Sequence, residues 1–234
     1  MDAPSAQPRD RATEAVIAAV RDATKTYALS SAPVAALKNV SLELRRGEMV
    51  ALVGPSGCGK STLLNMLSGV DRADSGAVVV CGVDLTHAAE SDLVRLRRSK
   101  IGIVFQAFHL VPHLSVEENV ALPLALAGVR DDERVRALLE RVGLGARRKH
   151  HPSELSGGEQ QRTAVARALV HKPALVLADE PTGNLDSASG AAVLALLDEL
   201  RRTEGAALVL ATHDAKVAAS ADRIVRMADG SLVP

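Results

Sequence analysis

The residues best suited to chemistry lie in one stretch, Gly-Pro-Ser-Gly-Cys-Gly-Lys-Ser-Thr. It matches a phosphate-binding pattern: Gly, four residues, then Gly-Lys-Ser/Thr. Its glycines let backbone N–H groups turn inward towards an anion, and the following helix adds its positive dipole end. The lysine can reach the β- and γ-phosphates, and the serine after it can bind Mg²⁺. We predict nucleotide binding by Gly54, Pro55, Ser56, Gly57, Cys58, Gly59, Lys60, Ser61 and Thr62.

Two adjacent acids, Asp179 and Glu180, follow an apolar run. An acid in this place can hold Mg²⁺ opposite Ser61, directly or through water. Glu180 can polarise an attacking water, and general-base assistance of this kind is worth ~10²–10⁴ in rate. Together with the phosphate loop, the acids predict hydrolysis of the bound nucleotide. A thiol at a helix N-terminus is often reactive, so we also expect alkylation of Cys58 to block activity.

The apolar runs 101–105, 174–178 and 207–211 indicate the elements that position these residues. Continuous apolar runs suit parallel strands that are buried on both faces. Helical patterns lie between them, which favours a mostly parallel α/β sheet with ligands at the carboxyl ends of its strands. Further strands are expected at 15–21, 40–44, 48–53 and 77–81, and helices at 115–127 and 132–142.

Composition bounds the function. The chain has 234 residues, 47% of them apolar, and a net charge of zero, so nothing favours broad binding to nucleic acid. No apolar run approaches the ~18 residues of a membrane helix, so we expect no direct membrane insertion. The two cysteines suit a reducing compartment. Residues 1–13 read as a flexible tail, and the basic run 147–151 favours a solvated linker over a binding patch.

The hexapeptide Leu155-Ser-Gly-Gly-Glu-Gln160 carries a more specific signal. Ser156 and Glu159 make a capping box, and glycines beside a serine at a helix N-terminus also form an anion site. The hexapeptide resembles the signature motif of the ABC-type ATPases. The resemblance extends over residues 14–234 and implies a P-loop NTPase fold of the RecA-like kind, with a mostly parallel sheet, an antiparallel β subdomain and an inserted α-helical subdomain. The core is expected at about 14–106 and 157–234, and the helical subdomain at about 107–156.

The same resemblance assigns roles to single residues. Gln106 resembles the Q-loop glutamine, which senses Mg²⁺ or the attacking water. His213 resembles the switch histidine, which contacts the γ-phosphate or orients Glu180. Tyr27, which we expect to follow a strand, resembles the aromatic residue that stacks on adenine. The implied cofactors are ATP and Mg²⁺, with Ser61, Gln106 and Asp179 at the metal.

Members of the family work as head-to-tail dimers, and the resemblance implies that Ser156, Gly157, Gly158 and Glu159 of one subunit meet the ATP held by the other. It further implies a membrane permease as partner, contacted near Phe108–Ala127, and a cytoplasmic location on the inner face of the membrane. Phe105 is expected in the core and Phe108 at a partner contact. Residues 178–186 and 119–124 look most like the lipoprotein-release and macrolide-export subgroup. The alternative is a non-transport regulator of the cell-division type.

Overall fold

The computed structural model describes residues 15–28 and 32–234, and the expected tail 1–13 lies outside them. The strands are β1 Val16–Ala28, β2 Pro33–Arg45, β3 Met49–Val53, β4 Ser75–Val80, β5 Val83–Asp84, β6 Ile101–Val104, β7 Leu175–Asp179, β8 Ala207–Thr212, β9 Arg223–Ala228 and β10 Ser231–Val233. The helices are α1 Lys60–Leu67, α2 Glu90–Lys100, α3 Val116–Leu126, α4 Asp132–Arg141, α5 Gly157–Leu169, α6 Ser187–Glu204 and α7 Ala215–Ala218, with 3₁₀ turns at Gly145–Arg147 and Pro152–Glu154.

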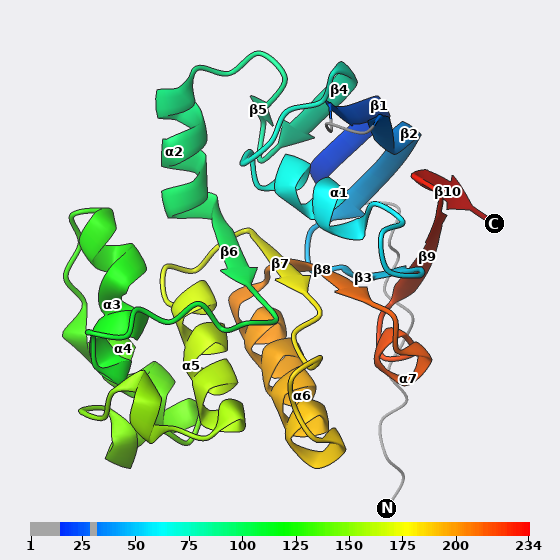
Figure 1. The fold of residues 1–234 in the computed structure, drawn as a ribbon. Helices are drawn as coiled ribbons and strands as arrows, with labels where there is room; N and C mark the ends of the chain where they lie inside the picture. Colours follow the sequence, from blue (N-terminus) through cyan, green and yellow to red (C-terminus); the bar gives the residue numbers. More distant parts are fainter. Residues whose placement is uncertain (1–14, 29–31) are drawn as a thin grey trace, which may run out of the picture.

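The strands form two sheets. Six of them lie in the order β10-β9-β3-β8-β7-β6, parallel except for β10, and four form the antiparallel sheet β2-β1-β4-β5. In Figure 1, α1 lies between the two sheets, whereas α5 and α6 cover the opposite face of the parallel sheet. The predicted α/β class, with a second antiparallel sheet, is confirmed.

The central strands bury alternate side chains in two different cores. In β8, Val209 packs with α1 and the antiparallel sheet, while its neighbours Leu208 and Leu210 pack with α3–α6. Both faces are therefore dry, which explains the uninterrupted apolar runs in the sequence. Within the described segment 107–156 the structure has helices and no strand.

Several elements differ from their predicted bounds. β1 continues through polar residues to Ala28, because its pairing with β2 resumes after each of several register shifts and extends to Ala28 opposite Pro33. Tyr27 is thus inside a strand and does not follow one, as we had expected. The helix α2 and the strands β9 and β10 were not predicted. Charged side chains interrupt their short apolar patterns, as Arg223 and Arg226 do in β9.

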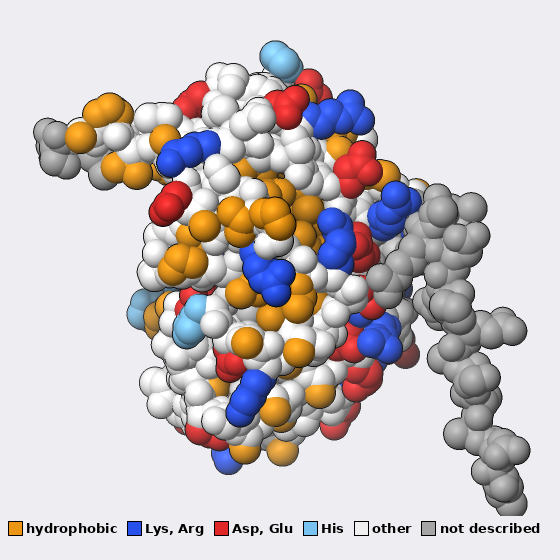
Figure 2. All heavy atoms as spheres, turned by 90° about the vertical axis from the view of Figure 1, so that its right-hand side faces the viewer, with side chains coloured by type: hydrophobic (Ala, Val, Ile, Leu, Met, Phe, Trp, Pro, Cys, Tyr) orange, Lys and Arg blue, Asp and Glu red, His pale blue; other side chains and the backbone are white. Residues whose placement is uncertain are grey.

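Figure 2 shows the side of the molecule that carries β9 and β10. Apolar side chains reach the surface there in groups with charged side chains between them. Ile224 of β9 and Val233 of β10 are among the exposed apolar residues. No helix among the described residues combines the length and the apolar character needed to cross a membrane.

Candidate functional site

The predicted phosphate loop borders a cleft of about 480 Å³ at the carboxyl end of β3. Ser56, Gly57 and Gly59–Thr62 line it from the loop and the first turn of α1, and Glu180 lines it from beyond β7. The strand β2 and the β9–β10 turn complete the lining with Val34–Ala36, Lys38, Asp229 and Gly230. The structure therefore brings together the phosphate loop and one of the two predicted acids.

Lys60 is the buried cation of this cleft, only 5% exposed. Its Nζ donates hydrogen bonds to the Gly54 and Pro55 carbonyls, at 2.8 and 3.0 Å. Gly59 has φ of 107°, and a Cβ there would lie 2.5 Å from the Ala36 carbonyl oxygen, so only glycine fits. The loop thus holds a buried ammonium at the start of α1, where the first N–H groups of a helix are available to an anion, as a phosphate site requires.

The Cys58 thiol is buried, 4% exposed, and its Sγ lies 3.9 Å from Lys60 Nζ. A thiol in this position is shielded from an alkylating reagent as long as the loop keeps its conformation. The expected reactivity of Cys58 therefore requires the loop to open first.

The two predicted acids, Asp179 and Glu180, differ in backbone conformation. Asp179 is the last residue of β7 and keeps an extended backbone, whereas Glu180 has φ of 44°, an unfavourable conformation for a residue with a side chain. The Glu180 N–H donates to the Ala211 carbonyl at 3.0 Å, which extends the β7–β8 ladder and holds the turn. Its Oε1 lies 3.1 Å from Nδ1 of His213, which follows β8. Strain of this kind is typical of functional sites.

Gln106 follows β6 and is exposed, and it does not belong to the lining of the cleft. It forms two hydrogen bonds with Asn184: Gln106 Nε2 donates to Asn184 Oδ1 at 3.4 Å, and Asn184 Nδ2 donates to the Gln106 carbonyl at 3.0 Å.

The neighbouring Phe105 is half-buried against His109, with ring centroids 4.7 Å apart. Our prediction that Phe105 belongs to the core is wrong, because this ring faces a surface groove.

Sequence reasoning missed Gln161, a fully buried glutamine of α5. Its Nε2 donates to the Pro181 carbonyl at 2.6 Å and to the Phe105 carbonyl at 3.3 Å, so it joins the turn after Glu180 to the segment of Gln106. Its Oε1 is buried and has no hydrogen-bond partner among the residues that the structure describes. The sequence does contain a sign of its burial. Gln161 lies at helical spacing from Ala164 and Ala168, on the apolar face of α5, so a buried polar side chain could have been predicted there.

The signature turn, which we define as Ser156–Glu159 at the start of α5, forms a capping box. Ser156 Oγ accepts from the Glu159 N–H at 3.3 Å, and Glu159 Oε2 accepts from the Ser156 N–H at 2.9 Å. These bonds to Ser156 hold the pKa of Glu159 below its ordinary value. Ser156 is exposed, and a Cβ on Gly157 would lie 3.8 Å from the Phe108 ring. Ser156–Glu159 are not part of the lining of the phosphate cleft in this chain.

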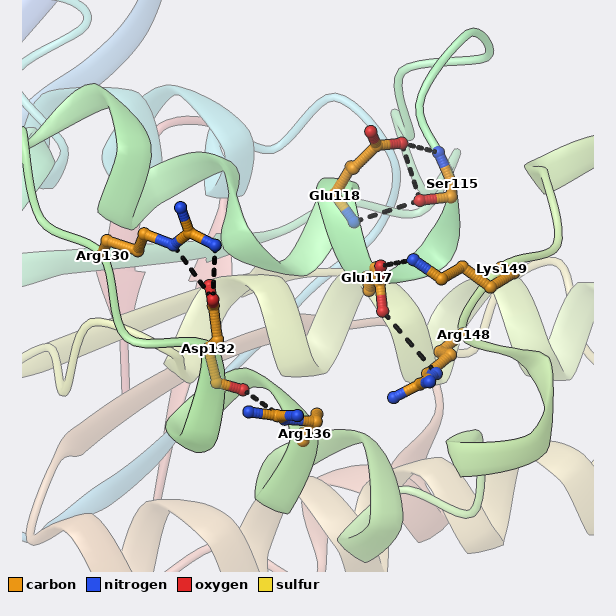
Figure 3. Close-up of polar contacts among 8 residues, drawn as sticks. All are labelled: Ser115, Glu117, Glu118, Arg130, Asp132, Arg136, Arg148 and Lys149. Carbon is orange, nitrogen blue, oxygen red and sulfur yellow. Dashed lines mark hydrogen bonds and ion pairs between the residues drawn. The ribbon is translucent and has the colours of Figure 1, made fainter.

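The basic run 147–151 is exposed but well paired. Figure 3 shows Arg148 and Lys149 approaching Glu117 at the start of α3, and the Arg148 Nε–Glu117 Oε2 distance is 3.9 Å. Arg147 lies 3.5 Å from Glu159 of the signature turn. The backbone of this run also accepts the Val116 and Glu117 N–H groups of α3. The run is therefore exposed to solvent, as we expected of a linker, and it also ties α3 to the turn at the start of α5.

Tyr27 lies in β1 opposite Val34, which lines the cleft. Its Oη donates to Asp71 Oδ2 at 2.6 Å. Burial and this hydrogen bond raise the pKa of Tyr27, while an interaction with the Thr62 side chain lowers it. Tyr27 is thus next to the first turn of α1, although it is not part of the cleft lining.

Comparisons with known proteins agree with this arrangement. Residues 37–183 match the profile of the family described as ABC transporter. The chain is 49% identical over 201 residues to an uncharacterised ABC transporter ATP-binding protein of Mycobacterium tuberculosis, and the match covers 85% of this chain and 81% of that one. A dimeric ATP-binding cassette solved in a post-hydrolysis state with ADP and Pi has a TM-score of 0.85 and 39% identity, with 93% and 97% of the two chains covered.

Two longer proteins are similar over 92% of this chain. They are the macrolide export ATP-binding/permease protein MacB of Shigella flexneri, 45% identical, and the pyoverdine export ATP-binding/permease protein PvdT of Pseudomonas aeruginosa, 49% identical. The chain spans 33% of the length of each. Profile, relatives and fold agree, and this chain belongs to the ABC transporter family as one of its ATP-binding, ATP-hydrolysing domains.

Proposed function

We propose that this ATP-hydrolysing domain works as a head-to-tail homodimer that encloses two ATP molecules. The observation that carries the proposal is the position of the signature turn: Ser156–Glu159 lie outside the lining of the cleft that holds Lys60. A helix N-terminus with two glycines is suited to bind phosphate, and Ser156 is exposed to receive it. A second subunit can supply this turn to the cleft. The dimeric state of the solved cassette with ADP and Pi supports the same arrangement.

The residues of the cleft divide the chemistry between them. The backbone of Ser56–Thr62 and the Lys60 ammonium bind the phosphates, and Tyr27 stacks on the base. Glu180 takes the proton of the attacking water, while His213 holds its carboxylate and contacts the γ-phosphate. The N–H of Glu180 is bonded to the Ala211 carbonyl, which fixes the turn. The Glu180 carboxylate is therefore in place as general base before ATP binds, and no rearrangement of the turn is needed.

The oxygen donors near the cleft are of the kind that binds Mg²⁺. A serine hydroxyl on the first turn of α1 and a carboxylate at the end of β7 are hard oxygen donors, and Mg²⁺ is usually bound by few protein oxygens together with water and phosphate. Ser61 and Asp179 would hold the ion, and Gln106 would join them when its loop moves towards the cleft. When bound, the ion neutralises charge on the phosphates.

A membrane permease docks, in this proposal, beside Phe108–Ala127. Phe105, His109, Leu122, Pro123 and Leu126 line a largely apolar surface groove of about 330 Å³ next to α3. Arg167 holds one wall, because its guanidinium donates to the Phe108 and His109 carbonyls at 2.7 and 2.6 Å, and burial lowers the pKa of Arg167. Phe108 and His109 both have positive φ. Gln161 connects the groove to the cleft, because its Nε2 donates to the carbonyl of Phe105, which lines the groove, and to the carbonyl of Pro181, which follows Glu180. Movement of an occupant can therefore reach Glu180.

Export is the direction that the relatives favour over the cell-division alternative, since MacB and PvdT are both named as export ATP-binding/permease proteins. The chain then lies on the inner face of the cell membrane, held there by its permease.

The groove can be tested with Leu126→Asp, because Leu126 is 54% exposed at its edge. A charge there costs binding of an apolar partner segment, so we expect the variant to leave the membrane fraction of its native host. Val70→Asp is the matched control, since Val70 is 62% exposed and is not in the groove lining. Equal membrane retention of Leu126→Asp and the native chain would contradict the docking site.

A further inference from the structure

The ring of Tyr27 is fixed by two charged neighbours. Its Oη donates to Asp71 Oδ2 at 2.6 Å, and Lys25 Nζ lies 5.4 Å from the ring centroid, over one face. Lys25 is two residues earlier in β1, so its side chain leaves the strand on the same side as Tyr27. One face of the ring is thus covered by a cation, and a base has only the opposite face to stack on.

Asp71 is held in place from several sides. Its Oδ1 lies 2.8 Å from Lys25 Nζ and accepts from the Arg72 N–H at 2.7 Å, while Lys25 Nζ also donates to the Arg72 carbonyl at 2.8 Å. The Asp71 N–H donates to the Asn65 carbonyl of α1 at 3.2 Å. Asp71 is therefore anchored to the helix that begins in the phosphate loop. The Tyr27 ring and the phosphate cradle are linked through one helix.

The charges of this network are stabilised by each other. Burial raises the pKa of Asp71, but the hydrogen bonds from Lys25, Tyr27 and the Arg72 N–H, together with the charge of Lys25, outweigh it and hold this pKa below its ordinary value. Hydrogen bonding to Asp71 raises the pKa of Lys25. The side chains of Lys25 and Asp71 are only 13% and 25% exposed, so water screens the pair weakly.

We propose that Asp71 and Lys25 are positioning residues for the nucleotide base: they fix the plane of Tyr27 and leave one face open to an adenine held by its phosphates in the adjacent cleft. The inference rests on the proposed stacking of Tyr27. A ring that is already ordered loses less rotamer entropy when the base binds. We expect the effect in binding of the base, because in this proposal the phosphates contact the loop and Lys60, and not Tyr27.

The test compares a ligand with a base and one without. Dissociation constants of ATP and of inorganic tripolyphosphate are measured by calorimetry for the full chain and for Asp71→Ala. Losing one hydrogen bond and one ion pair at the ring should weaken ATP about 3- to 10-fold. Tripolyphosphate binding should stay unchanged, because it has no base to stack. An equal loss for both ligands would mean that Asp71 only supports the fold, and would overturn the proposal.

Two further variants show whether a loss of ATP affinity comes from the Tyr27–Asp71 contact or from a general disturbance of the structure. Asp71→Asn keeps an oxygen for the Tyr27 hydroxyl and should restore part of the ATP affinity, and it also serves if Asp71→Ala does not fold. Asp74→Ala is the matched control, because Asp74 bonds to Lys25 and to the Thr26 N–H but does not contact Tyr27. It should change ATP binding less than twofold, and a loss as large as that of Asp71→Ala would contradict the assignment.

Tyr27→Ala distinguishes this inference from the proposed function. If Tyr27→Ala weakens ATP and Asp71→Ala does not, base stacking stands and the positioning role fails. If Tyr27→Ala leaves ATP binding unchanged, the base contact itself is wrong and the positioning role fails with it.

Discussion

The phosphate loop and the signature turn are two helix N-termini with very different surroundings. At the phosphate loop the ammonium of Lys60 is 5% exposed and bound to two carbonyls, and a strained Glu180 faces the same cleft. At the signature turn Ser156 is exposed and forms hydrogen bonds with Glu159 of its own helix. The first terminus lines the cleft together with Glu180, and the second lies outside the lining of that cleft.

The difference supports our proposal that one chain carries two unequal parts of an ATP site. In the function that we propose, the cleft side supplies charge, metal ligands and a general base, which require burial and fixed geometry. The signature side supplies N–H groups and a dipole, which require only an exposed and well-capped helix start. In the dimer that we propose, ATP joins the two, so changes on either side should have distinct signatures.

The largest effect should come from Glu180→Gln. The amide cannot take a proton, so turnover should fall by ~10²–10⁴ while ATP remains bound. ATP-bound dimers should accumulate, which size-exclusion chromatography in the presence of ATP detects. Rapid turnover by this variant would remove Glu180 from the role of base.

Lys60→Ala should act earlier, on binding. Removing the buried ammonium leaves the β- and γ-phosphates without their charged partner, and we expect ATP affinity to fall at least ~100-fold, about 2.7 kcal/mol. Titration calorimetry checks this, with circular dichroism to confirm the fold. Affinity within threefold of the native value would contradict the position given to Lys60.

Ser156→Ala sharpens the comparison from the other side. The loss of the cap should cost about 1 kcal/mol of unfolding free energy. Binding of ATP to the monomer should be unchanged, since Ser156 is outside the cleft lining, whereas ATPase activity at high protein concentration should fall. If ATP binding by the monomer fell with it, Ser156 would act within its own subunit.

Gln161→Leu probes the connection between the two sides. It removes the side-chain donor from the Pro181 carbonyl and leaves the Phe105 carbonyl with the long 3.4 Å bond from the Phe108 N–H. It also removes the buried Oε1 of Gln161, so we expect a loss of about 1–2 kcal/mol of unfolding free energy. Urea denaturation measures it, and Gln160→Leu, on the half-buried side of the same turn, is the control. A stabilised Gln161→Leu would show that these hydrogen bonds contribute nothing.

The smallest effect concerns pH. Asp71 has a lowered pKa, so its contribution to stability is present above the pH range where a free aspartate titrates and is lost as pH falls through its lowered folded pKa. The difference in unfolding temperature between the native chain and Asp71→Asn should therefore be constant from about pH 5 to 8 and shrink below about pH 4. A constant difference down to pH 2 would contradict the ion pair with Lys25.

The parts of the fold that could be predicted from sequence are those with one dominant signal. The strands that hold Asp179 and precede the phosphate loop are buried on both faces, so they are apolar throughout. The capping box of Ser156 and Glu159 depends on two residues three apart, and it is present as predicted. Strands such as β9, which carries Arg223 and Arg226, lack such a pattern and depend on tertiary pairing with β3.

Contacts between distant segments could not be predicted. The Gln106–Asn184 and Tyr27–Asp71 hydrogen bonds join residues 78 and 44 positions apart, and neither pairing has a local signal. The exposure of Ser156 could not be predicted either, since a capping box forms equally well in a buried turn. The sequence thus indicated the chemical groups, and the structure shows which of them share a cleft.

The central claim is that the site is shared between subunits, and the most direct test is the dependence of ATPase activity on protein concentration. At saturating ATP, specific activity should rise with concentration and follow the dimer fraction measured by sedimentation. It should fall towards zero where only monomer remains. Specific activity that stays constant down to concentrations at which no dimer survives would contradict a site completed by a second subunit.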